Sequence, residues 1–227
     1  MPRRNDTLDA EALCTKIARR LARLPASAKT PEIRAIRREY SRRIAGAGER
    51  QVLRLALCLL ERHHHRGFAY ELLHHHAPAL RSLGARDLAR LGRGIDAWWK
   101  VDTFGLYLAG PAWREGQIND ARIIAWARAD DRWWRRTALV CTVALNVKAR
   151  GGNGDVRRTL RICRLLLDDH DDMVVKALSW ALRALVSHDR RAVRAFLARY
   201  DGRLAARVKR EVTHKLRTGL KHPRRRR

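Results

Sequence analysis

The sequence is poor in acidic residues, and it contains no long apolar run. Its 227 residues include 50 Lys and Arg but only 23 Asp and Glu, so the formal net charge is +27. No stretch of about 18 uncharged apolar residues occurs, and we therefore expect no membrane-spanning helix. Residues 1–6 lack the apolar stretch of a signal peptide, so we expect the protein to stay in the cytoplasm. The 46% of hydrophobic residues excludes a disordered chain.

The motifs of several enzyme classes are also missing. The sequence contains neither GxGxxG nor GxxxxGK[ST], which are the glycine-rich loops that bind dinucleotides and nucleoside triphosphates. It also lacks the GxSxG turn that carries a nucleophilic serine in many acyl-transfer enzymes. We therefore expect no nucleotide cofactor and no serine-based acyl transfer.

Cysteine is scarce, and its four positions are far apart. All four lie in apolar helical patterns, so we interpret them as buried, reduced thiols rather than a disulfide framework. These residues are Cys14, Cys58, Cys141 and Cys163.

Histidine occurs in two runs, residues 63–65 and 74–76. Successive side chains on a helix project about 100° apart, so three adjacent histidines cannot face one ion together. A site that combines one histidine from each run stays open as an alternative. We expect the histidines to be surface or helix-end residues, and we expect no bound metal.

The excess of positive charge is the first informative feature that is present. Of the 50 basic residues 42 are Arg and 8 are Lys. A GC-rich genome would favour Arg over Lys, but it would not produce a twofold excess of basic over acidic residues. Because such an excess repels itself in a compact chain, it indicates a polyanionic partner. Nucleic acid is the first candidate, and an acidic membrane surface or an acidic protein is the alternative.

Apolar residues recur at helical spacing along most of the chain. Leu53, Ala56, Leu57 and Leu60 follow the i, i+3, i+4, i+7 pattern of an amphipathic helix. No sustained alternation of apolar and polar residues predicts strands. We therefore predict about a dozen helices, with a loop at the glycine-rich residues 151–154.

The helices show a repeat of about 40 residues. Ala56, Ala97, Ala138 and Ala177 are separated by 41, 41 and 39 positions. This period is typical of HEAT-type helical pairs, which bury their apolar faces by stacking on their neighbours. The sequence thus predicts an all-α solenoid of stacked antiparallel helical pairs with a basic concave face. We expect a single domain over residues 1–227, with residues 1–6 and 221–227 as frayed tails.

All seven tryptophans lie within residues 98–180. We interpret Trp113 and Trp126 as core residues, which is the usual place for a helical tryptophan. Trp98–Trp99 and Trp133–Trp134 are adjacent pairs, and two neighbours on a helix cannot both point into one core. We therefore expect one member of each pair to pack in the core and the other to emerge on another face.

Trp98 and Asp102 are four residues apart, so they share one helix face. An aromatic ring beside a carboxylate can bind a cationic ligand through the ring face and the negative charge together. The alternative is a surface aspartate that only pairs with an arginine.

The segment Trp98-Trp99-Lys100-Val101-Asp102 resembles the W-x-x-V-D motif of the HEAT-like-repeat DNA alkylation repair glycosylases of the AlkD type. The similarity covers most of the chain, in order and at similar spacing. It continues in residues 30–34, 126–130, 133–139 and 176–183. Trp99 and Lys100 place a bulky and a basic residue at the two variable positions of the motif.

The resemblance implies an enzyme that hydrolyses the N-glycosidic bond of positively charged N3- or N7-alkylated purines in duplex DNA. By motif position, Asp102, Trp98 and Trp180 form the catalytic site. Arg136 holds a backbone phosphate, and we expect the neighbouring Arg135 to contact DNA as well. The expected enzyme is a monomer without metal or cofactor, and it joins the nucleoid when bound to DNA.

Two other functions stay open from the sequence. The first is a non-catalytic module of the same fold that binds branched or damaged DNA. The second is a HEAT-type protein scaffold whose arginine content reflects codon bias.

Overall fold

The computed structural model describes residues 8–25 and 27–220, and throughout this range the regular structure is helical, without strands. The predicted all-α class is confirmed. Contacts divide the chain into two compact units, Met1–Arg93 and Gly94–Arg227. Within the described residues no helix is long and apolar enough to cross a bilayer.

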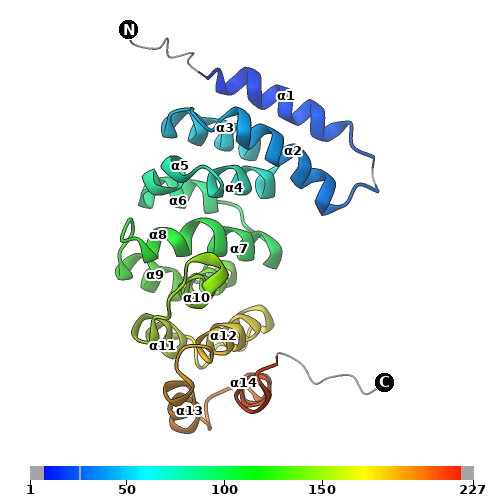
Figure 1. Ribbon diagram of the computed structural model, residues 1–227. Coiled ribbons are helices and arrows are strands. Elements are labelled where there is room, and N and C mark those ends of the chain that lie inside the picture. The colour runs from blue at the N-terminus through cyan, green and yellow to red at the C-terminus, as the bar shows by residue number, and fades with distance from the viewer. Residues whose placement is uncertain (1–7, 26, 221–227) are drawn as a thin grey trace. The chain divides into compact units, whose positions relative to one another are not determined.

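The amino-terminal unit is a set of layered helices around α3 (Figure 1). Its helices are α1 (Ala10–Ala22), α2 (Thr30–Arg43), α3 (Glu49–Glu61), α4 (Arg66–His74), α5 (Ala77–Ser82) and α6 (Ala85–Gly92). Helix α3 packs against α1, α4 and α5, and α2 packs against α4. The predicted apolar stripe of Leu53, Ala56, Leu57 and Leu60 is buried, which confirms the helical pattern.

The carboxyl-terminal unit continues with the same layered packing. Its elements are α7 (Trp98–Phe104), η1 (Gly105–Ala109), α8 (Gly110–Arg114), α9 (Asp120–Ala127), α10 (Arg132–Asn146), η2 (Lys148–Arg150), α11 (Val156–Leu165), α12 (Asp172–Leu185), α13 (Arg190–Arg199) and α14 (Ala206–Thr218). Helix α10 packs against α7 and α12, and α12 packs against α14. These four helices form one row, while α9 and α11 pack together in a second row. Stacking in rows is the packing expected of helical repeats.

The predicted repeat of about 40 residues, with one alanine at an equivalent helical position in each repeat, is only partly correct. Ala56, Ala138 and Ala177 are fully buried in α3, α10 and α12. Ala97 instead has extended backbone and is the N-cap of α7, because this helix begins at Trp98.

Aspartate or asparagine is the N-cap residue of many of the helices, so several of the few acidic residues stabilise helix ends. Their side chains accept hydrogen bonds from backbone N–H groups that have no partner within the first turn. The residues that cap helices in this way are Asp9, Asn119, Asp131, Asp155, Asp171 and Asp189.

Helices α7, η1 and α8 run without a break from Trp98 to Arg114, and their middle turn is a π-helix. Gly105 and Gly110 allow this helix to approach α10 closely. A Cβ atom on Gly105 would lie 2.7 Å from Val140 Cγ1, and one on Gly110 would lie 2.5 Å from Ala144 Cβ. Only glycine fits at such contacts, so these two positions set how closely η1 and α8 approach α10.

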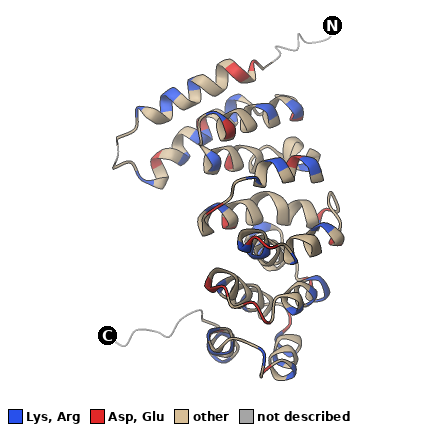
Figure 2. Ribbon diagram, turned by 180° about the vertical axis from the view of Figure 1, so that it is seen from behind, with Lys and Arg blue, Asp and Glu red and all other residues tan. Residues whose placement is uncertain are grey.

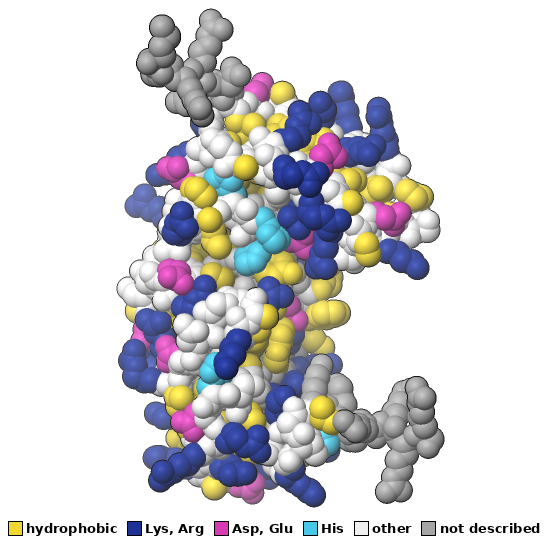
Figure 3. Space-filling view, viewed as in Figure 1, with side chains coloured by type: hydrophobic (Ala, Val, Ile, Leu, Met, Phe, Trp, Pro, Cys, Tyr) yellow, Lys and Arg dark blue, Asp and Glu magenta, His cyan; other side chains and the backbone are white. Residues whose placement is uncertain are grey.

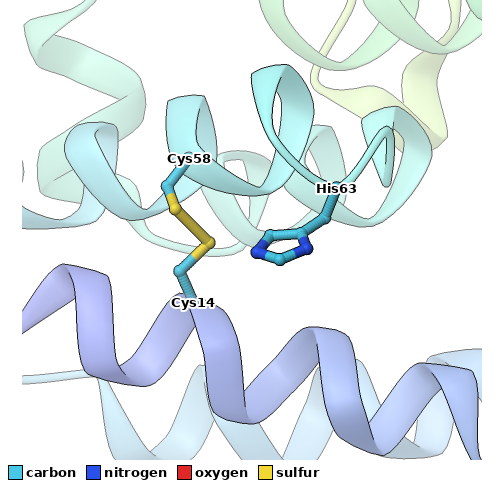
Figure 4. A group of neighbouring side chains, drawn as sticks. All are labelled: Cys14, Cys58 and His63. Carbon is cyan, nitrogen blue, oxygen red and sulfur yellow. A yellow bond between two sulfur atoms is a disulfide. The ribbon is translucent and has the colours of Figure 1, made fainter.

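The cysteine prediction is half right. Cys141 and Cys163 are buried free thiols, and burial raises the pKa of both. Cys14 and Cys58 form a disulfide between α1 and α3, so the prediction of four reduced thiols was wrong for this pair (Figure 4). Their separation of 44 residues gave no sign of the contact, which arises because α1 packs against α3.

The histidine runs lie at helix ends, as predicted. Residues 63–65 follow α3, while His74 ends α4 and His75 is its C-cap. His76 is buried, and its Nδ1 caps α5 by accepting a hydrogen bond from the Ala79 N–H.

Basic side chains are present on helices of both units (Figure 2). On the face shown in Figure 3 they outnumber the acidic side chains, as the composition requires. The residues predicted as frayed tails, 1–6 and 221–227, lie outside the described residues. The single domain and the basic concave face stay predictions.

Candidate functional site

A cavity of about 530 Å³ opens in the carboxyl-terminal unit, along the row of α7, α10, α12 and α14. This volume lies within the range of about 300–1,000 Å³ that is usual for small-molecule sites. The residues that line it are Trp98, Asp102, Arg136, Met173, Lys176, Trp180, Arg183, Arg207 and Glu211.

Helix α7 contributes an aromatic ring and a carboxylate from one face. Trp98 and Asp102 are one helical turn apart, and both line the cavity, as their spacing predicted. Trp98 is 55% exposed, whereas only 18% of the Asp102 side chain is exposed. The large ring therefore stands at the open side of the cavity, and the carboxylate lies deeper.

Arg136 of α10 fixes the Asp102 carboxylate. Its Nε donates to Asp102 Oδ1 at 3.0 Å, and its Nη2 donates to Oδ1 at 2.8 Å and to Oδ2 at 3.0 Å. Its Nη1 donates to the Met173 carbonyl at 2.5 Å. A two-pronged pair of this kind sets the plane of the carboxylate as well as its position. Only 6% of the Arg136 side chain is exposed.

Two opposing effects act on the pKa of Asp102. Burial raises this pKa, because a low-dielectric environment disfavours the charged carboxylate. The charge and the hydrogen bonds of Arg136 lower it, and the net pKa stays above the ordinary value for aspartate.

Helix α12 lines the cavity with a periodic set of side chains. Met173, Lys176, Trp180 and Arg183 are spaced by three, four and three residues, which places them on one helix face. The N-cap Asp171 fixes where this helix starts, because its carboxylate accepts from the N–H groups of Met173 and Val174.

Helix α14 adds Arg207 and Glu211, which are again one turn apart. Glu211 accepts a hydrogen bond from the Ser179 hydroxyl at 2.6 Å and lies 3.5 Å from Arg183 Nη2. Arg183 Nε in turn donates to Ser179 Oγ at 3.2 Å. These three side chains link α14 to α12 beside the cavity.

Four of the five predicted site residues come together. Asp102, Trp98, Trp180 and Arg136 all line the cavity, although they come from three helices. Arg135 does not line it. Its Nε pairs with Asp169 at 2.6 Å, and its Nη1 donates to the carbonyls of residues 129 and 130.

The tryptophan predictions are confirmed for Trp113 and Trp126, but neither adjacent pair has the predicted buried member. Trp113 and Trp126 are buried. Trp133 and Trp134 are each half-buried, and the Trp134 ring stacks on Trp126 at 4.9 Å. For Trp98–Trp99 the expectation of one core member was wrong, because both rings are exposed at the start of α7. Trp98 lines the cavity, whereas the Trp99 ring contacts the Lys100 ammonium at 5.5 Å.

Five lining residues were not predicted from the sequence: Met173, Lys176, Arg183, Arg207 and Glu211. Three of them could have been found, because Met173, Lys176 and Arg183 share the helix face of Trp180. Glu211 could also have been found, since it is the only acidic residue after Asp201 in a strongly basic segment.

The cavity is lined by charges of both signs, with four basic side chains and two carboxylates. Two indole rings and two carboxylates can attract positive charge, whereas none of the nine lining residues is a cysteine or a histidine. The buried Arg136 keeps the Asp102 carboxylate oriented, and Lys176 and Arg207 add positive charge at half-exposed positions. Such an arrangement fits a ligand that combines a cationic group with a phosphate.

Comparison with known families gives one match. A family model described as DNA alkylation repair enzyme matches residues 26–216. The matched segment includes every residue that lines the cavity. The chain matches no curated protein and no solved structure.

Proposed function

Because the chain belongs to the DNA alkylation repair enzyme family, we propose that it is a monofunctional DNA glycosylase. Its substrate is duplex DNA that carries positively charged N3- or N7-alkylated purines, and it hydrolyses the N-glycosidic bond of the lesion. The observation that carries this proposal is the cavity in which Asp102, Trp98 and Trp180 meet. The same proposal includes action as a monomer at the nucleoid, without metal or nucleotide cofactor in the reaction.

The chemistry of the lesion explains why one oriented carboxylate suffices. An alkylated purine already carries a positive charge, so it leaves as a neutral base without being protonated by an acid. The barrier that remains is the positive charge that develops on the deoxyribose in an oxocarbenium-like transition state. A fixed negative charge close to the sugar lowers that barrier.

Asp102 supplies this charge. Its carboxylate is held by three hydrogen bonds from Arg136, so it needs little reorganisation when the sugar becomes cationic. The same carboxylate orients the water that attacks C1′ of the deoxyribose. The bond to the base breaks, the base leaves neutral with the bonding electron pair, and the water that adds to C1′ releases its proton to solvent.

Trp98 of α7 and Trp180 of α12 both line the cavity and hold the sugar with their rings. A ring face attracts positive charge, and the attraction increases as charge develops on the sugar. The exposed Trp98 ring can reach a nucleotide that stays in the duplex.

Arg136 acts as a positioning residue for Asp102. Its Nε and Nη2 donate to this carboxylate, and its Nη1 donates to the Met173 carbonyl. The predicted phosphate contact of Arg136 is retained as a second role, to be tested below. Lys176 and Arg207 are better placed for phosphate, since both line the cavity and are half-exposed. Arg135 contributes to DNA affinity outside the cavity.

The direct test is release of 7-methylguanine and 3-methyladenine from methylated duplex DNA, measured by chromatography together with the abasic product. We expect both bases to be released without added metal or nucleotide. Absence of release, combined with salt-sensitive DNA binding, would favour the non-catalytic module. About six phosphate contacts predict that the logarithm of the binding constant falls with the logarithm of the salt concentration at a slope of about −5. DNA binding that is undetectable or insensitive to salt would favour the protein scaffold.

A further inference from the structure

A second group of reactive side chains lies in the amino-terminal unit. Cys14 of α1, Cys58 of α3 and His63 of the following turn place their sulfur and nitrogen atoms within 4.8 Å of one another (Figure 4). Cys14 and Cys58 are buried, and His63 is partly buried. Nothing in the proposed glycosylase reaction uses these residues.

We propose that, when the Cys14–Cys58 disulfide is reduced, these three side chains form a binding site for Zn²⁺. Two thiolates and an imidazole are the ligand types that select zinc among the common divalent cations. The spacing of the histidines alone predicted no metal site. In the folded chain His63 lies beside two cysteines that are distant from it or from each other in the sequence.

Glu11 lies beside this group and needs only a side-chain rotation to supply the fourth ligand. Its Oε2 atom lies 3.9 Å from Cys58 Sγ, and Glu11 shares a face of α1 with Cys14, three residues later. Glu11 also forms an ion pair with Arg62, which lies next to His63. A carboxylate ligand that is hydrogen-bonded by a neighbouring cation is a common second layer of a zinc site.

The local charges and the geometry suit a divalent ion. Two thiolates and one carboxylate would supply three negative charges, which offset the ion and the adjacent Arg62. The Glu11 and Arg62 side chains are more than half exposed, so the ion has a path from solvent. Around a tetrahedral Zn²⁺ the two sulfur atoms lie about 3.8 Å apart, given Zn–S bonds of about 2.3 Å.

The disulfide and the zinc site exclude each other. A dithiol reductant supplies two electrons and two protons, which open the Cys14–Cys58 bond to two thiols while the reductant itself becomes a disulfide. Zn²⁺ then replaces the two thiol protons and forms two Zn–S bonds, and the protons go to solvent. Either state cross-links α1 to α3, so the ion maintains the connection that reduction would otherwise remove.

The test uses the full chain, reduced with a dithiol, separated from it without oxygen and titrated with Co²⁺. We expect one equivalent to bind, with the thiolate-to-cobalt charge-transfer band and the visible bands of a tetrahedral site, and with displacement by Zn²⁺. The disulfide form should give no charge-transfer band. His63→Ala should weaken Co²⁺ affinity by more than about 100-fold, since loss of an outer-shell partner alone costs about 10–100-fold.

The matched control is His64→Asn, which changes the neighbouring exposed histidine and retains a residue type that tolerates its positive φ of 57°. It should bind Co²⁺ like the wild type, and circular dichroism should show equal helix content in both variants. Absence of a charge-transfer band in the reduced wild type would overturn the proposal. Unchanged affinity in His63→Ala, or equal binding by the disulfide form, would overturn it as well.

Discussion

The two walls of the cavity carry the same three kinds of side chain but hold them differently. On the wall formed by α7 and α10, Arg136 binds Asp102 directly through three hydrogen bonds of 2.8–3.0 Å. On the wall formed by α12 and α14, Glu211 lies 3.5 Å from Arg183, and its shortest bond comes from the neutral Ser179 hydroxyl. Each wall also presents one tryptophan.

Burial does not explain this difference. The Asp102 and Glu211 side chains are 18% and 22% exposed, so both are largely removed from water. The hydrogen-bond partner differs. A guanidinium group that donates to both oxygens fixes the plane and the position of a carboxylate, whereas a single hydroxyl group fixes only one oxygen. We infer that the α7/α10 wall performs the chemistry and that Glu211 mainly joins α14 to α12.

The largest effect should come from Asp102→Asn. The amide keeps the size of the side chain but removes the charge that stabilises the cationic sugar, so base release should fall at least about 100-fold. DNA affinity should be equal or higher, because a negative charge is lost from a surface that faces phosphates. Asp96→Asn is the control, since Asp96 is an exposed partner of Lys100 and does not line the cavity. Near-normal release by Asp102→Asn would remove Asp102 from the mechanism.

The next largest effect should come from Arg136→Ala, which leaves Asp102 without its cation. Because breaking a buried ion pair costs about 3–5 kcal/mol, the melting temperature should fall.

Release requires ionised Asp102, so the rate falls as pH falls through the pKa of that carboxyl. In the wild type the pH at which the rate falls on the acid side of the profile, the acid limb, should lie above the ordinary aspartate pKa of about 3.9. Removing Arg136 should move the limb to still higher pH.

The same variant separates the two roles of Arg136. A positioning role predicts a shifted pH–rate profile with nearly unchanged binding to undamaged duplex. A phosphate contact instead predicts weaker binding to damaged and undamaged duplex alike, with a smaller salt slope. An unshifted acid limb in a folded protein would exclude the positioning role.

Trp98→Ala and Trp99→Ala form a matched pair with an intermediate expected effect. Both rings are exposed, but only Trp98 lines the cavity. Loss of a cation–π contact of about 1.4 kcal/mol predicts about a tenfold slower release for Trp98→Ala. Trp99→Ala should change the rate much less. The reverse order, measured in the same single-turnover assay, would assign the sugar contact to Trp99.

Glu211→Gln should have the smallest effect. The amide still accepts a hydrogen bond from Ser179 Oγ, and only the 3.5 Å attraction to Arg183 is lost. We expect release to fall by less than about threefold, with a small decrease in melting temperature, because one charge of a largely buried network disappears. A loss comparable to that of Asp102→Asn would show that both walls take part in the chemistry.

The features that could be predicted from the sequence are those that depend on the spacing of residues close together in the chain. The helical class followed from apolar periodicity, and the shared face of Trp98 and Asp102 followed from their separation by four residues. Their meeting with Trp180 was implied by the family resemblance. The pairing of Asp102 with a particular arginine required the packing of α7, η1 and α8 on α10, which depends on Gly105 and Gly110. Short-range spacing contains no such contact.

Long-range contacts also account for the errors. The Cys14–Cys58 disulfide joins residues 44 positions apart, and no local pattern relates them. Arg135 and Arg136 are neighbours in the sequence, but the turn of the helix directs one to Asp169 and the other to Asp102. Glu211 belongs to the cavity only because α14 packs against α12.

The central claim is that the two similar walls have unequal chemical roles. Its most direct test is the single-turnover release of 7-methylguanine by Asp102→Asn and Glu211→Gln, measured in parallel at equal DNA occupancy. We expect the Asp102 variant to be slower than the Glu211 variant by at least about 30-fold, the quotient of a 100-fold and a threefold loss. Equal rates in the two variants would contradict it.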